Sequence, residues 1–299
     1  MSRRSIFLLA ATVVLLYFSL IVFMLSPLHG ARQVYYSVGH RYALRGAAGV
    51  TWCKEPRYQP AGPSGRAVAL ASFPGSGNTW LRYLLQQATG IWTGSVYMDF
   101  GLKVRGFPAE NVTDATVLVV KTHESPPPDQ FKAAVLLVRN PRDAILADFN
   151  RHLMGHVGTA PISAFKMKSP DRKKSAWAVY VSKNVAAWEA LHARWLSRFA
   201  GRVLVVLYGA LVRDTRQALL DILDFLNHTV PEEDIYCAVV NKEGIYRRRK
   251  KLQDFDPFSA DMYRAMAAAR ARVAALITDY YRRHNITDKL PSIGDLLAQ

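Results

Sequence analysis

One loop of this sequence, between an apolar run and a helical pattern, has residues suited to binding a phosphate group. Residues 67–73 are apolar apart from one serine, which is typical of a buried strand. Pro74, Gly75 and Gly77 then interrupt the run, and apolar residues at helical spacing follow Thr79. Free backbone N–H groups in the first turn of a helix bind anions, and glycine permits the tight turn before them. The sequence therefore predicts an anion-binding loop.

This loop departs from the common nucleotide-binding pattern G-x-x-x-x-G-K-[ST] at two positions. Gly77 and Thr79 fit the pattern, but Ser72 stands at the place of the first glycine and Asn78 at the place of the lysine. In kinases and ATPases that lysine supplies positive charge to the transferring phosphate. A small-molecule kinase is therefore an alternative function only, which Mg-dependent turnover of ATP would support.

A second set of functional groups follows another apolar run. Residues 116–120 are rich in β-branched side chains, which favours a strand, and Lys121 and His123 come directly after it. In open α/β sheets, functional groups gather at the carboxyl ends of the strands. A histidine can accept the proton of an attacking hydroxyl group, and a nearby ammonium group can stabilise negative charge. Polar surface residues at a strand end are the alternative interpretation.

An arginine follows a third apolar run. Residues 133–138 predict a buried strand, and Asn140 and Pro141 after it are favourable first residues of a helix. Arg139 therefore lies between a strand end and a helix N-terminus. Its guanidinium group can bind a phosphate through two parallel hydrogen bonds, although a structural salt bridge would also explain it.

The remaining pattern predicts an α/β fold in which strands alternate with helices. Apolar runs at residues 67–73, 116–120, 133–138 and 202–208 predict the strands, and residues 175–199, 215–226 and those after Ser259 predict further helices. Residues 89–103 are interpreted as a loop beside the substrate cleft. The expected architecture has three layers around a central parallel sheet.

The N-terminal region predicts a membrane anchor. Residues 1–5 form a short basic tail, residues 6–25 contain no charged side chain, and residues 26–65 have the composition of a stem. Twenty apolar residues form a helix of about 30 Å, which is long enough to cross a bilayer. Basic residues tend to stay on the cytoplasmic side, so residues 66–299 would form a lumenal catalytic domain.

Other features of composition agree with a lumenal domain. The sequence has 39 Lys and Arg against 23 Asp and Glu, a net charge of +16 that favours acidic partners. Its two cysteines, Cys53 and Cys237, would either pair in an oxidising compartment or remain independent thiols. The N-glycosylation pattern occurs at three asparagines, Asn111, Asn227 and Asn285.

The motifs SFPGSGNTW, ATGIWTGS, VRNP and DFDPFSADM resemble those of the sulfotransferases that use 3′-phosphoadenosine-5′-phosphosulfate (PAPS). The similarity is greatest to the sulfotransferase domain of the WSC-domain-containing sialate O-sulfotransferases. It extends over residues 52–281. The resemblance implies a P-loop-like fold, PAPS as the sulfuryl donor and no required metal ion.

The resemblance also implies roles for individual residues. His123 would be the catalytic base and Lys121 the charge stabiliser, with Glu124 as the alternative base. Backbone amides of residues 75–79, with the side chains of Asn78 and Thr79, would hold the 5′-phosphosulfate. Arg139 and the basic loop at residues 242–250 would hold the 3′-phosphate. The full set of implied cofactor-binding residues is Pro74, Gly75, Ser76, Gly77, Asn78, Thr79, Trp80, Arg139, Tyr208, Lys242, Gly244, Arg247 and Arg248.

Two departures from the family pattern keep a non-enzymatic alternative open. Gly75 stands where cytosolic members have a lysine against the phosphosulfate, and Ala147 stands where the family often has a serine. The alternative is a catalytically inactive, membrane-anchored protein that binds acidic glycans.

The expected function is the transfer of a sulfuryl group from PAPS to a hydroxyl of a glycan, with sialylated glycans as the first candidates. The expected location is the Golgi membrane, with a single type II span and a lumenal catalytic domain. The expected acceptor is a glycan on a glycoprotein or glycolipid. Nucleic acid is not an expected partner.

Overall fold

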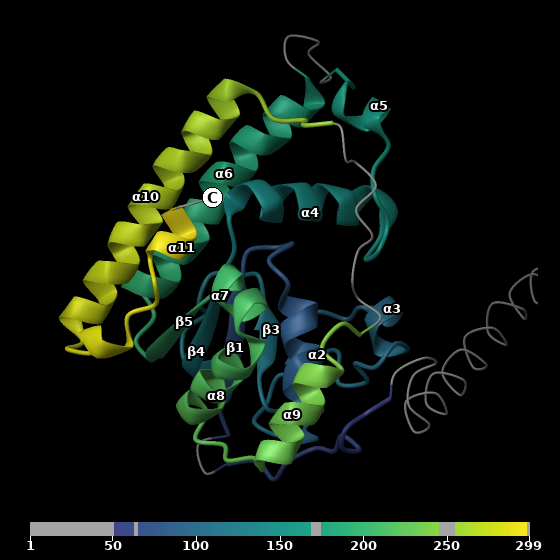
Figure 1. The fold of residues 1–299 in the computed structure, drawn as a ribbon, viewed down its shortest axis with the longest axis vertical. Coiled ribbons are helices and arrows are strands. Elements are labelled where there is room, and N and C mark those ends of the chain that lie inside the picture. The colour runs from purple at the N-terminus through teal and green to yellow at the C-terminus, as the bar shows by residue number, and fades with distance from the viewer. Residues whose placement is uncertain (1–50, 63–64, 169–174, 245–254, 298–299) are drawn as a thin grey trace, which may run out of the picture.

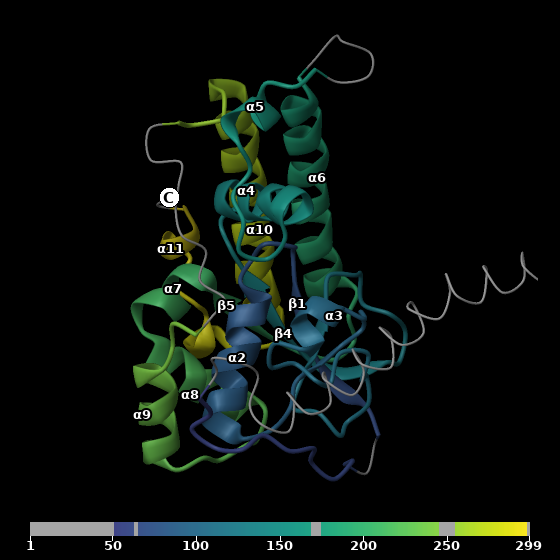
Figure 2. The same cartoon turned by 90° about the vertical axis from the view of Figure 1, so that its right-hand side faces the viewer.

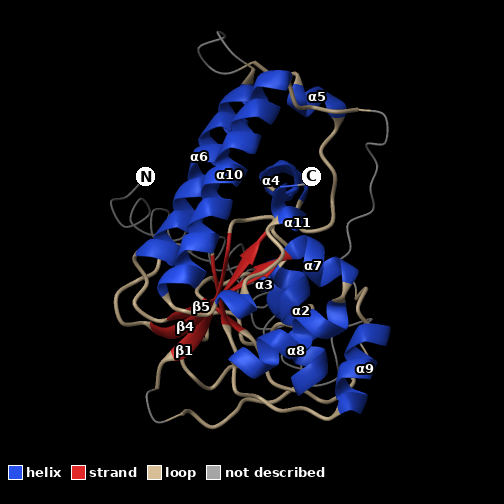
Figure 3. Ribbon diagram, turned by 60° about the vertical axis from the view of Figure 1, so that its left-hand side comes forward, coloured by secondary structure: helices blue, strands red, loops and turns tan. Residues whose placement is uncertain are grey.

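A five-stranded sheet forms the centre of the structure, a computed structural model that describes residues 51–62, 65–168, 175–244 and 255–297 (Figures 1 and 3). The strand order is β2-β3-β1-β4-β5, and every pair is parallel. β1 is central, so the loop that follows it lies at the middle of the carboxyl edge. The strands are β1 (Ala67–Ser72), β2 (Gly94–Ser95), β3 (Val120–Thr122), β4 (Phe131–Val138) and β5 (Arg202–Leu207).

Helices cover both faces of the sheet, which gives the three layers predicted from the sequence (Figure 1). Successive residues of a strand point to opposite faces, so Ala69 and Leu70 enter different hydrophobic clusters. The face of Ala69 packs against α4 (Pro141–Met154), α6 (Ala176–Ser197) and α10 (Ala260–Arg283). The face of Leu70 packs against α2 (Asn78–Thr89), α8 (Thr215–Phe225) and α9 (Glu232–Val240).

The two longest described helices, α6 and α10, lie side by side in both views (Figures 1 and 2). The tryptophans of α6 are buried, as their helical spacing predicts, and Trp188 and Trp195 have no exposed surface. The remaining short helices are α3 (Phe100–Lys103), α5 (Ile162–Phe165), α7 (Tyr208–Arg213), a 3-10 turn (Thr287–Lys289) and α11 (Gly294–Leu297).

Helix starts follow the expected capping chemistry. The side chain of Asn140 accepts a hydrogen bond from the backbone N–H of Arg142, and Pro141 is the first residue of α4. Ser259 accepts a hydrogen bond from the backbone N–H of Met262 at the start of α10. Both starts were predicted from the sequence and are confirmed.

Two predicted elements require correction. The strand expected at residues 116–120 begins at Val120, because the backbone of the preceding residues bonds elsewhere: Leu118 donates to Trp92, and Val117 accepts from Gln59. Residues 94–95, within the expected loop, form the short strand β2.

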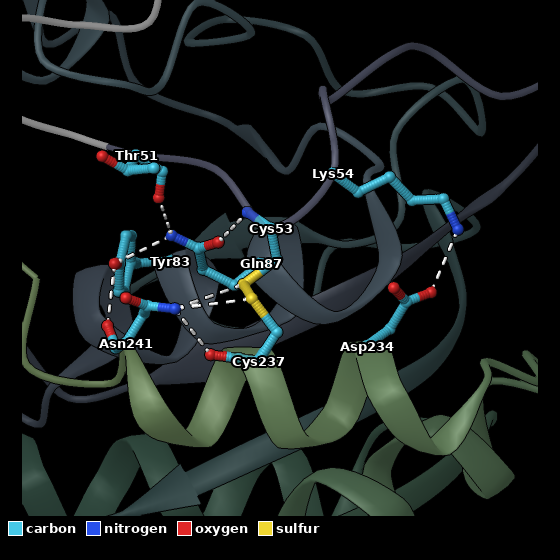
Figure 4. Close-up of a disulfide and its surroundings, with 8 residues drawn as sticks. All are labelled: Thr51, Cys53, Lys54, Tyr83, Gln87, Asp234, Cys237 and Asn241. Carbon is cyan, nitrogen blue, oxygen red and sulfur yellow. Dashed lines mark hydrogen bonds and ion pairs between the residues drawn. A yellow bond between two sulfur atoms is a disulfide. The ribbon is translucent and has the colours of Figure 1, made fainter.

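Of the predictions for the N-terminal region and the cysteines, the structure describes only those that fall after residue 50. The tail, the hydrophobic segment at residues 6–25 and the stem up to residue 50 lie outside the described residues. Within the described ranges, no helix combines the length and apolar character needed to span a bilayer. Cys53 and Cys237 form a disulfide, so the pairing that the sequence left open is confirmed (Figure 4).

Candidate active site

The loop between β1 and α2 is closely packed on two sides. Gly75 and Gly77 have φ angles of +77° and +94°, in the left-handed region that favours glycine. A Cβ atom on Gly75 would lie 2.3 Å from the carbonyl oxygen of Ala144 in α4. A Cβ atom on Gly77 would lie 2.6 Å from Cε2 of Tyr208. The packing therefore leaves no room for a side chain at either position, including the lysine that cytosolic family members have at the position of Gly75.

Hydrogen-bond donors at this loop are left for a ligand. No side chain among the described residues caps α2, and the N–H groups of a first helical turn have no intrahelical partner. The Ser76 side chain is fully buried, and its Oγ atom has no hydrogen-bond partner in the described part of the chain. Buried polar atoms are nearly always satisfied, so this hydroxyl is a candidate donor to a bound anion. Backbone amides and a hydroxyl group are the kind of donors that a phosphosulfate group requires.

Asn78 has a different role from the one implied by the resemblance. Its Nδ2 atom donates hydrogen bonds to the carbonyl oxygen of Leu70 at 2.9 Å and to Oγ of Ser72 at 3.1 Å. Both amide hydrogens therefore bind β1, and the side chain ties the strand to the start of α2. The expected side-chain bond from Asn78 to the phosphosulfate is wrong, and only its backbone N–H remains as a candidate donor.

Arg139 contacts both the loop and the residue that follows β5. Its Nη1 atom donates to the carbonyl oxygen of Gly75 at 2.9 Å, and its guanidinium carbon lies 4.3 Å from the ring centroid of Tyr208. Its Nε atom is buried and has no hydrogen-bond partner among the described residues. Tyr208 begins α7 and also contacts Trp80, with ring centroids 5.9 Å apart. The structure therefore brings Arg139, Tyr208 and Trp80 together around the loop.

The start of the basic run lies against α2. Nε1 of Trp80 donates to the carbonyl oxygen of Lys242 at 2.6 Å. Gly244 packs on Tyr83, because a Cβ atom there would lie 2.9 Å from Cε1 of that ring. Lys242 and Gly244 are therefore near the predicted cofactor residues, whereas the predicted Arg247 and Arg248 lie outside the described residues.

His123 lies beside the end of β1. Its Nδ1 atom is 2.8 Å from the carbonyl oxygen of Ser72, and its ring stacks on Tyr97 with centroids 5.7 Å apart. A carbonyl oxygen only accepts, so Nδ1 carries the proton and Nε2 is free to receive one. Burial and the charge of Lys121 lower the pKa of His123 to about 3. The imidazole is therefore neutral near pH 7, the form that a general base requires.

Lys121 and His123 lie two residues apart on the same side of the chain. The Lys121 side chain is buried, and its ammonium nitrogen lies 5.5 Å from the ring centroid of Tyr97. Burial, followed by the charge of Arg82, lowers the pKa of Lys121 to about 8, while the carboxylate of Glu110 opposes that shift. Lys121 is therefore mostly charged at neutral pH.

Glu124, the alternative base, is engaged by Tyr97. The Tyr97 hydroxyl donates to Oε1 of Glu124 at 2.8 Å and accepts the backbone N–H of His123 at 3.0 Å. Burial and the neighbouring Glu124 raise the pKa of Tyr97 to about 12. Of the two candidates, only His123 contacts the residue that precedes the phosphate-binding loop.

A buried ion pair supports this region and was not predicted. Arg82 and Glu110 lie 2.5 Å apart with fully buried side chains, and Arg82 also donates to Thr93. Glu110 in turn accepts the backbone N–H of Asp99. These residues are far apart in the sequence and share no motif, so no local signal connects them. Within the described ranges, no group of His, Cys, Asp and Glu side chains could hold a metal ion.

The profile of the sulfotransferase domain family matches residues 66–241 of this chain. A WSCD family member of Aedes aegypti is 46% identical over 255 residues, which cover 76% of this chain and 78% of the relative. WSCD family members of Drosophila melanogaster and Drosophila pseudoobscura pseudoobscura are 50% and 51% identical, over 69% of this chain and 64% of each relative. The match thus covers less than two thirds of the length of the two Drosophila proteins.

The solved structures that match this chain have low sequence identity to it. Mouse sulfotransferase SULT7A1 in complex with PAP has a TM-score of 0.42 at 14% identity, over 77% of this chain and 88% of that protein. A sulfotransferase from Alicyclobacillus acidocaldarius has a TM-score of 0.39 at 14% identity, over 73% of this chain and 96% of that protein.

Proposed function

Because this chain belongs to the WSCD group of the PAPS-dependent sulfotransferase family, we propose that it transfers a sulfuryl group from PAPS to a hydroxyl of a glycan in the secretory pathway. One observation carries the proposal. The buried and unpartnered Ser76 Oγ and Arg139 Nε atoms belong to the same glycine-lined loop region, which the hydrogen bond from Arg139 to Gly75 holds together. Such a pair of donors suits an anion with two phosphate groups.

The positions of the side chains support an assignment of the cofactor contacts. The first turn of α2 and Ser76 would hold the 5′-phosphosulfate, with Thr79 and Pro74 at the two ends of the loop. Arg139 and Lys242 would bind the 3′-phosphate, and Arg247 and Arg248 are further predicted ligands of that phosphate. Trp80 and Tyr208, whose rings are in contact, would bind the adenine.

Proton transfer at His123 completes the reaction. When bound, PAPS supplies the sulfuryl group, whose bond to the 5′-phosphate breaks as the acceptor oxygen bonds to sulfur. Nε2 of His123 takes the hydroxyl proton, because the bond to Ser72 keeps Nδ1 protonated. The ammonium group of Lys121 stabilises the negative charge that develops on the transferring group and the leaving phosphate.

A Golgi membrane location, with the enzyme domain lumenal and residues 6–25 as a type II anchor, is part of the proposal. The Cys53–Cys237 disulfide supports it, since disulfides persist in oxidising compartments. The three predicted glycosylation sites support it too, because Asn111, Asn227 and Asn285 are all exposed and have left-handed backbone angles typical of turns.

The acceptor class rests on charge and on the family resemblance. A net charge of +16 attracts acidic partners, and the motifs most resemble those of sialate O-sulfotransferases. Sialylated glycans on glycoproteins or glycolipids are therefore the first acceptors to test. A kinase is less well supported, because Asn78 stands at the lysine position and its side chain binds β1.

Calorimetric binding of PAP to the full chain in detergent, with ATP as competitor, tests the cofactor. Arg139→Ala should weaken PAP binding about 10- to 100-fold, the loss expected for a charged hydrogen-bonding partner. Arg272→Ala is the matched control, since Arg272 pairs with Glu189 on the surface. Transfer of labelled sulfate from PAPS to sialylated glycans then tests the reaction.

Three outcomes separate the candidate functions. PAP binding with sulfate transfer supports the proposal. PAP binding without transfer to any hydroxyl acceptor would favour the inactive glycan-binding alternative. A folded protein that does not bind PAP, but hydrolyses Mg–ATP or transfers its phosphate, would favour the kinase.

A further inference from the structure

One face of α2 joins the phosphate-binding loop to the disulfide. Trp80, Tyr83 and Gln87 are spaced three and four residues apart, so they form a stripe on this helix. Trp80 is in the first turn after the loop, and Gln87 is near the other end. Each of the three side chains makes a hydrogen bond to a segment that is distant in the sequence.

The far end of the stripe holds the disulfide (Figure 4). Oε1 of Gln87 accepts the backbone N–H of Cys53 at 2.7 Å, and its Nε2 donates to the carbonyl oxygen of Thr51 and the hydroxyl of Tyr83. The disulfide then joins Cys53 to Cys237 in α9. Both cysteines are only partly buried, so a small reductant can reach them.

Asn241 connects the disulfide to the basic run. Its Nδ2 atom lies 3.4 Å from Sγ of Cys237 and 3.7 Å from Sγ of Cys53, and it donates to the carbonyl oxygen of Cys237 at 2.9 Å. The carbonyl oxygen of Asn241 accepts from the Tyr83 hydroxyl at 2.9 Å. The end of α9 is thus fastened both to the disulfide and to the middle of the stripe.

The next residue reaches the cofactor site. The carbonyl oxygen of Lys242 accepts the indole N–H of Trp80, and Trp80 contacts Tyr208. Tyr208 packs against Gly77 and under the guanidinium group of Arg139. A continuous series of contacts therefore runs from the disulfide to the phosphate-binding loop.

We propose that the Cys53–Cys237 disulfide positions the cofactor site, acting through Asn241 and the Lys242 carbonyl on the indole of Trp80. This role rests on the proposed use of PAPS. Breaking the disulfide leaves the end of α9 held by fewer contacts, so Lys242 and Trp80 sample orientations that do not bind the nucleotide. Cofactor binding then weakens, whereas Lys121 on β3 and His123 directly after it keep their contacts.

The test compares PAP binding by the full-length protein in its oxidised and reduced states. Dithiothreitol transfers two electrons and two protons to the disulfide and is itself oxidised to a cyclic disulfide. We expect PAP to bind about tenfold more weakly after reduction, and equally weakly to the Cys53→Ser/Cys237→Ser variant. The KM for PAPS should rise by the same factor, while kcat changes less than about twofold.

A matched control removes a different contact between the segment around Cys53 and α9. Lys54 forms an ion pair with Asp234 of α9 at 3.0 Å, and within the described ranges its side chain makes no hydrogen bond to the stripe (Figure 4). Lys54→Met should leave PAP affinity within about twofold of the wild type, the small effect expected of an exposed ion pair. An equal loss in Lys54→Met and the cysteine variant would overturn the proposal, since any loosening of α9 would then suffice.

Coupling to Trp80 distinguishes positioning from general stabilisation. In a Trp80→Phe background, which lacks the indole donor, reduction should change PAP affinity by less than about twofold. Hydrogen exchange of the ligand-free protein should show faster exchange at residues 242–244 after reduction, with residues 120–123 unchanged. A full tenfold effect of reduction in Trp80→Phe would overturn the proposed route.

Folding is monitored by thermal unfolding of each sample. If the reduced protein unfolds, Asn241→Ala in the oxidised protein carries the test and should weaken PAP binding at least about threefold. Unchanged PAP affinity in a folded, reduced protein would overturn the proposal while leaving the function intact. An oxidised wild type that fails to bind PAP would overturn the proposed function itself, and this role of the disulfide with it.

Discussion

The Nδ1 atom of His123 lies 2.8 Å from the carbonyl oxygen of Ser72, and this contact joins the residue after β3 to the last residue of β1. The phosphate-binding loop starts directly after Ser72. The same hydrogen bond therefore places the imidazole beside the loop and selects the tautomer with a free Nε2. Tyr97 stacks on the imidazole ring and restricts its rotation.

Replacing His123 with asparagine should remove catalysis and leave PAP binding intact. An asparagine amide can still donate a hydrogen bond to the Ser72 carbonyl oxygen. It cannot take the proton from the hydroxyl group of the acceptor substrate. We expect sulfate transfer in a single turnover to slow by about 10²- to 10⁴-fold, the usual contribution of a general base. Glu124→Gln is the comparison and should lose less than about tenfold. The reverse order of effects would identify Glu124 as the base.

The alkaline side of the pH profile should report Lys121. Its pKa is lowered to about 8, so it is charged below that pH and loses its proton as the pH rises through it. We expect kcat/KM, which reports the free enzyme, to fall above about pH 8. In Lys121→Arg, a guanidinium group stays charged, so any remaining activity should persist to higher pH. An unchanged alkaline limb in that variant would contradict the assignment.

The acid side of the profile should lack the usual histidine limb. Burial and Lys121 lower the pKa of His123 to about 3, so the base is already neutral at pH 5 to 6. We expect kcat/KM to stay nearly constant between pH 7 and pH 5.5, measured with an acceptor that does not titrate in this range. A tenfold loss per pH unit below 6.5 would show an ordinary, solvent-exposed histidine instead.

Gly77→Ala should disrupt the phosphate-binding loop. The added Cβ atom would lie 2.6 Å from Tyr208, and alanine must also adopt a φ angle of +94°. We expect a loss of about 2 to 4 kcal/mol in the free energy of unfolding, with PAP binding strongly reduced. Gly65→Ala is the matched control, because its φ angle of +60° is also positive but no atom lies within 4 Å of the new Cβ. Equal effects of the two substitutions would show that backbone strain alone matters.

Glu110→Gln should destabilise the fold far more than loss of an exposed ion pair. The substitution removes the carboxylate that pairs with the fully buried guanidinium group of Arg82. We expect the free energy of unfolding, measured with urea, to fall by about 3 to 5 kcal/mol. Asp279→Asn, which breaks the exposed pair with Arg283, should cost no more than about 0.5 kcal/mol. A small effect at Glu110 would mean that water reaches Arg82.

The local features of the fold and the site could be read from the sequence. Apolar runs placed β1, β4 and β5, helical spacing placed the buried face of α6, and Asn140 with Pro141 marked the start of α4. The glycines of the phosphate-binding loop were also recognisable, because they stand directly between a strand pattern and a helix pattern. Each of these signals depends on neighbouring residues, since strand and helix periodicity and capping act within a few positions.

Only the tertiary structure decided how distant residues meet. The start of β3 depends on the hydrogen bonds that Val117 accepts from Gln59 and Leu118 donates to the Trp92 carbonyl oxygen. The pairing of Arg82 with Glu110 joins α2 to a loop 28 residues away. The inward bonds of the Asn78 side chain likewise need the completed sheet. These contacts gain their strength from burial in a common core, and burial is a property of the folded chain that no sequence window contains.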